Sequence, residues 1–111
     1  MTEGQAQRKF TLMIAQLIEW AYANGYELTF GDAYRDPRLH GGFGITRGYG
    51  SANSQHKRRM AVDLNLFING AYIADGSKYA PLGEYWESIG GAWGGRWNDG
   101  NHFSISYNGY R

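Results

Sequence analysis

The residues whose types and spacing could do chemistry fall into two pairs. His56 is followed seven residues later by Asp63, and His102 is preceded three residues earlier by Asp99. The third histidine, His40, has no comparable partner pattern and is interpreted as a loop residue. The chain has no cysteine, so a metal site would need nitrogen and oxygen ligands, and disulfides and cysteine nucleophiles are excluded.

His56, Asp63 and His102 together offer the ligands of a catalytic zinc, which takes three protein ligands and keeps one position open for water. A bound zinc would lower the pKa of that water to about 7. A second carboxylate near the water can accept its proton and pass it to a leaving amine, and Asp99 is the natural candidate. These residues would therefore be able to support metal-dependent hydrolysis.

The spacing limits where the ligands can lie. Seven residues of straight helix would separate His56 from Asp63 by about 10 Å, and an odd offset in a flat strand would put them on opposite faces. We therefore expect His56 on a loop that folds back towards Asp63 on its strand. A glycine lies between Asp99 and His102, so a turn there could bring both to the same side.

Each candidate also has a purely structural interpretation. An isolated histidine in a small domain is usually a surface or hydrogen-bonding residue, and Asp99 lies in a common turn composition. If Asp63 faced inward it would need a cation or strong donors, because a buried unpaired carboxylate costs several kcal/mol; if it faced outward it would need neither. Arg35 is either a surface arginine paired with a nearby aspartate or a guanidinium that binds a substrate carboxylate or a developing oxyanion.

The elements that must position these residues begin with a helix, a strand and a long loop. Apolar residues recur at helical spacing through residues 3–24, and Asn24-Gly25 is a typical helix end. Residues 26–30 alternate as a short strand. Residues 31–55 are rich in glycine and poor in periodic apolar positions, which predicts a long loop of the kind that often carries function.

The second half of the chain predicts a hairpin, a helix and a closing strand. We expect these elements at residues 61–67, 71–73, 81–88 and 102–107. Asn69-Gly70 favours a two-residue hairpin turn, and the glycine- and tryptophan-rich stretch 92–101 is expected to be a loop whose Trp93 and Trp97 line the core or a cleft. The order predicts one small α+β domain, residues 1–111, with an antiparallel sheet and flanking helices.

Composition and charge exclude several classes of protein. Hydrophobic residues make up 42% and aromatic residues 16% of the chain, which is enough for a packed core. A formal net charge of +1 gives no case for a nucleic-acid partner, and the basic run 57–59 is short enough to be a solvated loop. No apolar run reaches transmembrane length, and residues 1–9 lack the apolar core of a secretory signal, so we expect no membrane insertion.

Two motifs resemble the signatures of the D-alanyl-D-alanine metallopeptidases. Residues 54–64 (SQHKRRMAVDL) resemble the Ser-x-His-x6-Asp signature of that family, and residues 99–103 (DGNHF) resemble its second signature. Residues 31–35 match the segment where the family carries an arginine. Arg59 and Ser104 stand where the family often has glycine and an acidic residue, which bears on the substrate more than on the chemistry.

The resemblance covers most of the chain, from about Tyr26 to Phe103, and residues 82–86 and 93–96 look like the bacteriophage branch in particular. It implies a Hedgehog/DD-peptidase-like α+β fold. It also implies roles for five residues: His56, Asp63 and His102 bind Zn²⁺, Asp99 is the general base and acid, and Arg35 contacts the substrate or the tetrahedral intermediate.

The function implied is a zinc metallopeptidase that cuts the peptidoglycan stem peptide. We favour a monomeric L-alanyl-D-glutamate endopeptidase of the bacteriophage endolysin type. The alternatives are a D-alanyl-D-alanine carboxypeptidase and a non-catalytic wall-binding module, although the latter predicts loss of a ligand or of the base and none is lost. We expect the protein to be made in the cytoplasm without a signal peptide and to reach the cell wall through a holin or by virion entry.

Overall fold

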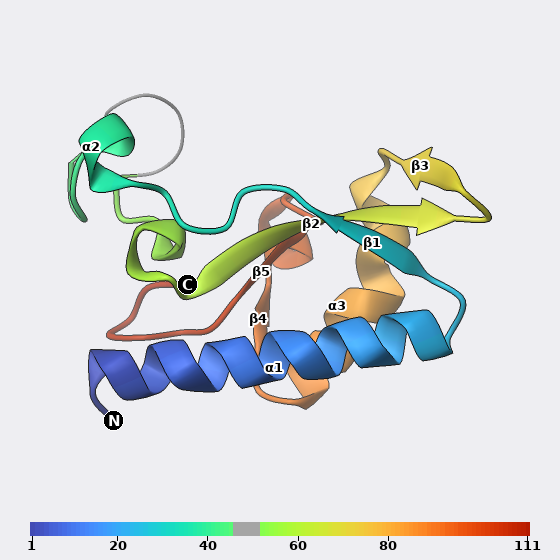
Figure 1. Ribbon diagram of the computed structural model, residues 1–111, viewed down its shortest axis with the longest axis horizontal. Coiled ribbons are helices and arrows are strands. Elements are labelled where there is room, and N and C mark those ends of the chain that lie inside the picture. Colours follow the sequence, from blue (N-terminus) through green and yellow to red (C-terminus); the bar gives the residue numbers. More distant parts are fainter. Residues whose placement is uncertain (46–51) are drawn as a thin grey trace.

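An antiparallel sheet built around one long strand, β2 (Ala61–Ile68), organises the molecule (Figure 1). The computed structural model describes residues 1–45 and 52–111. Four strands run in the order β1-β2-β5-β4, and β3 pairs with β2 beyond the end of β5. The other strands are β1 (Glu27–Phe30), β3 (Ala71–Ile73), β4 (Ala92–Trp93) and β5 (His102–Ser104).

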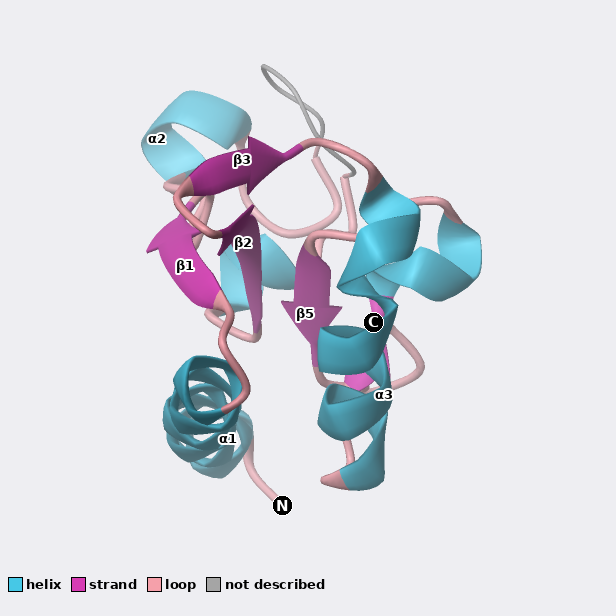
Figure 2. Cartoon of the chain, turned by 90° about the vertical axis from the view of Figure 1, so that its right-hand side faces the viewer, coloured by secondary structure: helices cyan, strands magenta, loops and turns pink. Residues whose placement is uncertain are grey.

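Two helices cover one face of this sheet, α1 (Glu3–Ala23) and α3 (Ala80–Ser88). Figure 2 shows α1 nearly end-on beneath β1 and β2, with α3 beside it. α1 begins at a capping box, in which the Thr2 hydroxyl accepts from the Gln5 backbone N–H and the Gln5 side chain accepts from the Thr2 backbone N–H. The predicted α+β architecture with an antiparallel sheet and flanking helices is therefore confirmed.

The hydrophobic core lies between these helices and β2. On β2 the residues Val62, Leu64 and Leu66 are buried, and from Asp63 to Phe67 they alternate with less buried neighbours, as the sequence pattern predicts. The core also takes large side chains from both helices and from β5: Phe10, Met13, Leu17, Leu82, Trp86 and Phe103. Burial of these apolar side chains against one sheet face is what holds the helices in place.

The hairpin after β2 forms as predicted. Asn69 and Gly70 both have positive φ, 53° and 77°, which is the backbone conformation that a tight type I′ turn requires. The hydroxyl of buried Tyr79 then ties the hairpin together, because it accepts from the Leu66 backbone N–H at 2.9 Å and donates to the Ile73 carbonyl at 3.1 Å.

Three sequence-based expectations need correction. The predicted loop 31–55 contains a short helix α2 (Pro37–His40) and ends at the first residue of a 3₁₀ turn η1 (Gln55–Arg58). Its residues 46–51 lie outside the described part of the chain. The predicted loop 92–101 contains β4 and the 3₁₀ turn η3 (Gly94–Trp97); another 3₁₀ turn, η2 (Gly76–Tyr79), leads into α3.

The third correction concerns the closing strand, which ends at Ser104 rather than at Tyr107. Ser104 pairs with Ala61, where β2 begins, so β2 itself extends no further along the closing segment. The Ile105 backbone N–H still donates to the carbonyl of Met60, the residue before β2, at 3.2 Å. The chain instead turns back at Asn108 and Gly109, both with positive φ, and Tyr107 pairs with Tyr110.

Among the described helices, none has the length and apolar character to cross a membrane.

Candidate metal centre

His56 is carried by the 3₁₀ turn η1, directly before β2. The Ser54 hydroxyl caps this turn by accepting from the His56 backbone N–H at 3.1 Å, and Arg59 ends it in the left-handed conformation with φ 58°. This turn is the local fold-back that the sequence required between His56 and Asp63. The His56 side chain is 2% exposed.

The orientation of the His56 ring is set by a backbone carbonyl. Nδ1 lies 2.8 Å from the Ala33 carbonyl oxygen, which can only accept, so Nδ1 carries the proton and donates. In the neutral ring Nε2 then keeps its lone pair, and this atom lies 3.2 Å from Oδ1 of Asp63. A histidine held in this way by a backbone carbonyl is typical of a metal ligand.

Asp63 projects from the sheet face opposite to the core. Its neighbours Val62 and Leu64 are buried under the helices, and strand alternation turns Asp63 to the other side. There it is covered by the two histidines, so its side chain is only 19% exposed although it faces away from the core. Both alternatives left by the sequence therefore apply in part: Asp63 points outward and is nevertheless largely buried.

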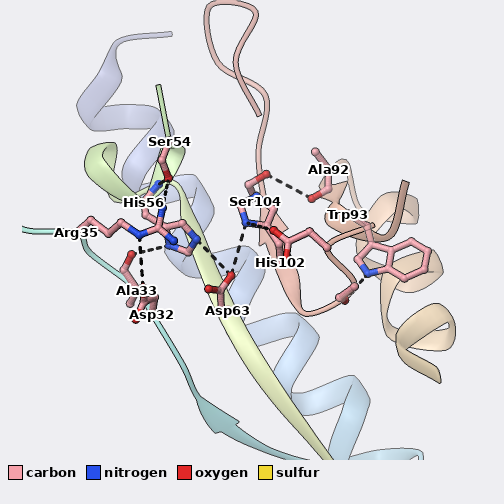
Figure 3. Close-up of polar contacts among 12 residues, drawn as sticks. Asp32, Ala33, Arg35, Ser54, His56, Asp63, Ala92, Trp93, His102 and Ser104 are labelled. Carbon is pink, nitrogen blue, oxygen red and sulfur yellow. Dashed lines mark hydrogen bonds and ion pairs between the residues drawn. The ribbon is translucent and has the colours of Figure 1, made fainter. Parts of the chain in front are cut away.

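His102 reaches Asp63 through the pairing of β2 with β5. Asp63 and His102 are direct cross-strand partners, which places their side chains on the same sheet face. Nδ1 of His102 lies 3.6 Å from Oδ1 of Asp63, and the two imidazole rings are 5.2 Å apart between centroids. In Figure 3 the two histidines approach Asp63 from two sides.

The arrangement fits a metal ion better than it fits a hydrogen-bonded cluster. The three ligand atoms lie within 4.8 Å of one another, and atoms bound to one tetrahedral zinc would be about 3.4 Å apart. Oδ1 of Asp63 is buried and, despite its two close imidazoles, has no aligned hydrogen-bond partner among the described residues. A cation bound between these atoms would satisfy the carboxylate and both nitrogen lone pairs.

The electrostatics of Asp63 agree with this arrangement. Burial, the largest single influence, raises the pKa of its carboxyl group, but interactions with His102 and then with His56 lower that pKa by more. The net pKa lies well below its ordinary value. Asp63 is therefore ionised at neutral pH, as a metal ligand must be.

Asp99 supplies a second carboxylate in a different environment. It lies in the turn before β5, next to Asn98 in the left-handed conformation with φ 61°. Its side chain is 49% exposed, and its Oδ2 lies 3.7 Å from Nδ1 of His102. Asp99 is thus on the same side as His102, as expected, but remains open to solvent and to a substrate.

Glycines allow this turn to lie so close to the site. A Cβ on Gly94 would lie 2.2 Å from the Asp99 carbonyl oxygen and 2.6 Å from Cβ of His102. A Cβ on Gly100 would lie 2.4 Å from the carbonyl oxygen of Gly76. The segment around Gly76 therefore supports the turn that carries Asp99 and His102.

Arg35 is held against the base of η1. Its backbone N–H donates to the His56 carbonyl at 3.0 Å, its Nη1 donates to the Ser54 hydroxyl at 3.0 Å, and its Nε lies 3.4 Å from Oδ2 of Asp32. Asp32 is therefore the aspartate that pairs with Arg35, and the guanidinium lies beside the turn that carries His56. Ser54 links the two, because its hydroxyl contacts both Arg35 and the His56 backbone.

A cavity of about 220 Å³ lies beside His56 and His102. It is lined by Arg35, Asn53, Ser54, His56, Trp97, Asp99, His102 and Arg111. The sequence indicates no role for Ser54 beyond its place in a motif, and Arg111 lies in no motif. Trp97 faces the site, with its ring 5.6 Å from that of His102, whereas Trp93 is buried in the core.

His40 does not reach this cavity. It lies in α2, is 4% exposed, and its carbonyl accepts from Nζ of Lys57 at 3.0 Å. It is therefore a buried helical residue rather than the loop residue that the sequence suggested.

Comparison with known proteins gives an independent result. The family model described as D-alanyl-D-alanine carboxypeptidase matches residues 47–105, which is more than half of the 111-residue chain. The match contains His56, Asp63, Asp99 and His102, whereas Arg35 and Arg111 lie outside it. No curated protein matches the chain. With its His-Asp-His group beside a second carboxylate, the chain belongs to the D-alanyl-D-alanine carboxypeptidase family of metallopeptidases, which act on peptide bonds.

Proposed function

We propose that this protein is a zinc-dependent peptidase that cuts the stem peptide of peptidoglycan between L-alanine and D-glutamate, in the manner of a bacteriophage endolysin. The observation that carries the proposal is the convergence of His56, Asp63 and His102 within 4.8 Å, in contact with a cavity that also contains Asp99. On this proposal the protein reaches the wall through a holin or by virion entry.

The three ligands favour zinc because two imidazoles and one carboxylate are a common catalytic zinc set. When bound, zinc supplies a Lewis acid, and it lowers the pKa of a bound water enough for a hydroxide nucleophile to be available at neutral pH. The chain itself supplies the orientation: the Ala33 carbonyl holds His56 with Nε2 towards the site, and strand pairing holds His102 opposite Asp63.

Asp99 is the proposed proton carrier. Its carboxylate lines the cavity, is half exposed, and lies beside His102 without covering it. In this position it can accept a proton from the attacking water at one carboxylate oxygen and deliver that proton to the leaving nitrogen. Asp63 cannot do this, because it is buried between the two imidazoles.

Arg35 is proposed to stabilise negative charge that develops on the scissile carbonyl oxygen. Its guanidinium is fixed at Nε by Asp32 and at Nη1 by Ser54, so it needs little reorganisation during the reaction. It shares the cavity with Asp99.

The experiment that tests the proposal measures zinc content and peptidoglycan hydrolysis in four proteins: wild type, His56→Ala, Asp99→Ala and His40→Gln. We expect His56→Ala to lose zinc and activity. Asp99→Ala should keep zinc and lose about 10²–10⁴-fold in turnover. His40→Gln, which alters the histidine outside the site, should keep both, provided that circular dichroism shows it is folded.

Full hydrolysis by His56→Ala or by metal-stripped protein would end the proposal. Wall binding without hydrolysis in the wild type would instead favour a wall-binding module. A D-alanyl-D-alanine carboxypeptidase is the second candidate, favoured by the description of the matching family. Mass analysis of the released fragments separates the two, because one reaction splits the stem after L-alanine and the other releases free D-alanine.

A further inference from the structure

Arg111 places a second guanidinium at the cavity. It lines the cavity together with Arg35, and its guanidinium carbon lies 4.2 Å over the ring of Trp97. No carboxylate of the described residues forms an ion pair with it, whereas Arg35 has Asp32 beside it. The cavity therefore contains one arginine whose charge is not matched by an acidic side chain.

Buried hydrogen bonds fix the segment that carries Arg111. Gln55, the residue before His56, is fully buried, and its Nε2 donates to the carbonyls of Ile105 at 2.9 Å and Tyr110 at 3.2 Å. Tyr107 and Tyr110 also exchange two backbone hydrogen bonds of 2.9 and 3.0 Å. The same turn that positions a metal ligand thus positions the residue before Arg111.

Arg111 and Arg35 are attached to different walls of the cavity. Arg35 is tied to Ser54 and Asp32, beside η1. Arg111 lies on Trp97, which comes from the same segment as Asp99 and packs against His102. Stacking on an indole ring restrains the guanidinium and leaves its N–H groups able to bind an anion.

We propose that Arg111 determines specificity by binding the free carboxylate of the amino acid whose nitrogen leaves. This rests on the proposed function: Asp99 protonates the leaving nitrogen, so the residue attached to that nitrogen lies along the wall of Asp99 and Trp97. In the stem peptide this residue carries a free α-carboxylate at either bond. D-Glutamate has one because it is linked through its side chain, and terminal D-alanine has one because the chain ends there.

The test uses pairs of stem peptides that differ only in this group, an α-carboxylate against an α-carboxamide. We expect wild type to cleave the carboxylate peptide with kcat/KM about tenfold or more above the amide peptide, as a charge-assisted arginine contact implies. Arg111→Gln should lose this preference by slowing cleavage of the carboxylate peptide alone, and Arg111→Lys should restore part of it. Arg96→Gln is the matched control, because Arg96 also lies near a tryptophan ring, Trp93, but outside the cavity.

If Arg111→Gln slowed cleavage of both peptides equally, Arg111 would only support Trp97, and the proposal would be overturned. Unchanged kcat/KM for both peptides would overturn it as well. A binding measurement separates this failure from failure of the proposed function. In zinc-loaded Asp99→Asn, calorimetry should show tighter binding of the carboxylate peptide, and adding Arg111→Gln should remove the difference. If wild type cleaves neither peptide, the proposed function is wrong, and equal binding of the two peptides would reject the role of Arg111.

Discussion

The two faces of strand β2 differ in what they contribute. On one face Leu64 and Leu66 are almost completely buried beneath α1 and α3, and they belong to the hydrophobic core. On the other face Asp63 meets His56 and His102, away from α1 and α3. Residues next to each other in sequence therefore serve stability and chemistry separately, and substitutions on the two faces should separate the two properties.

The largest effect is expected at Asp63 on the site face. Asp63→Asn keeps the shape of the side chain and removes the charge, so zinc binding should fail and hydrolysis should fall by about 10³-fold or more. Thermal melts with and without a chelator check this: the chelator should lower the Tm of wild type and leave that of Asp63→Asn unchanged. A chelator-sensitive melt in Asp63→Asn would contradict the assignment of Asp63 as a ligand.

The neighbouring residue on the core face should behave in the opposite way. Leu64 is 1% exposed, so Leu64→Ala should lower the free energy of unfolding by about 2–5 kcal/mol by removing buried methyl groups and leaving a cavity. Zinc bound per folded molecule should stay the same. Urea denaturation measures the stability and metal analysis the stoichiometry. Loss of zinc from folded Leu64→Ala would show that the two faces are coupled.

A smaller effect, confined to the site face, is expected at Gly100. In Gly100→Ala the new Cβ would lie 2.4 Å from the Gly76 carbonyl oxygen and 2.7 Å from its Cα, so the turn with Asp99 and His102 must shift. A shift of about 1 Å can cost about 10²-fold in activity. Gly42→Ala is the control, since no atom of the described residues lies within 4 Å of a Cβ at that position. Steady-state kinetics should show kcat/KM reduced only in Gly100→Ala; equal kinetics in both would mean that the turn adapts.

The smallest effect is expected at Tyr79, on the core side of the hairpin. Tyr79→Phe leaves the Leu66 backbone N–H without its 2.9 Å acceptor, which should cost about 1–3 kcal/mol. Burial raises the pKa of the Tyr79 phenol, so the unfolded chain ionises first as pH rises. The stability that Tyr79 contributes is complete below about pH 10 and is lost above it. Denaturant melts from pH 8 to 11 should therefore fall more steeply for wild type than for Tyr79→Phe, and parallel curves would reject this account.

Much of the fold could be predicted because local patterns and tertiary packing agree. The apolar spacing of α1, the alternation of β2 and the Asn69-Gly70 turn all predicted elements that the structure contains. The closing strand was predicted too long, because alternation in residues 105–107 does not show whether a partner strand lies beside them. β4 was missed because two residues are too few to produce a pattern.

For the candidate site too, some residues could be named from the sequence and others could not. His56, Asp63, His102 and Asp99 could be named from the sequence because they match two family signatures, whereas their spacing alone left purely structural interpretations open. The participation of Arg111 could not be predicted, since its position depends on Gln55 reaching the carbonyls of Ile105 and Tyr110, about fifty residues away in sequence. Nothing in the types of neighbouring residues indicates such a contact.

The sequence by itself determined the chemical inventory: nitrogen and oxygen ligands, a second carboxylate and an antiparallel α+β scaffold. These follow from residue types and short-range periodicity, which are local properties. Tertiary structure alone decided that Asp63 faces away from the core and is still buried, and that His102 lies opposite it in register. It also decided that Arg35 and Arg111 belong to different walls of one cavity. The physical reason is that burial and proximity depend on which distant segments pack together.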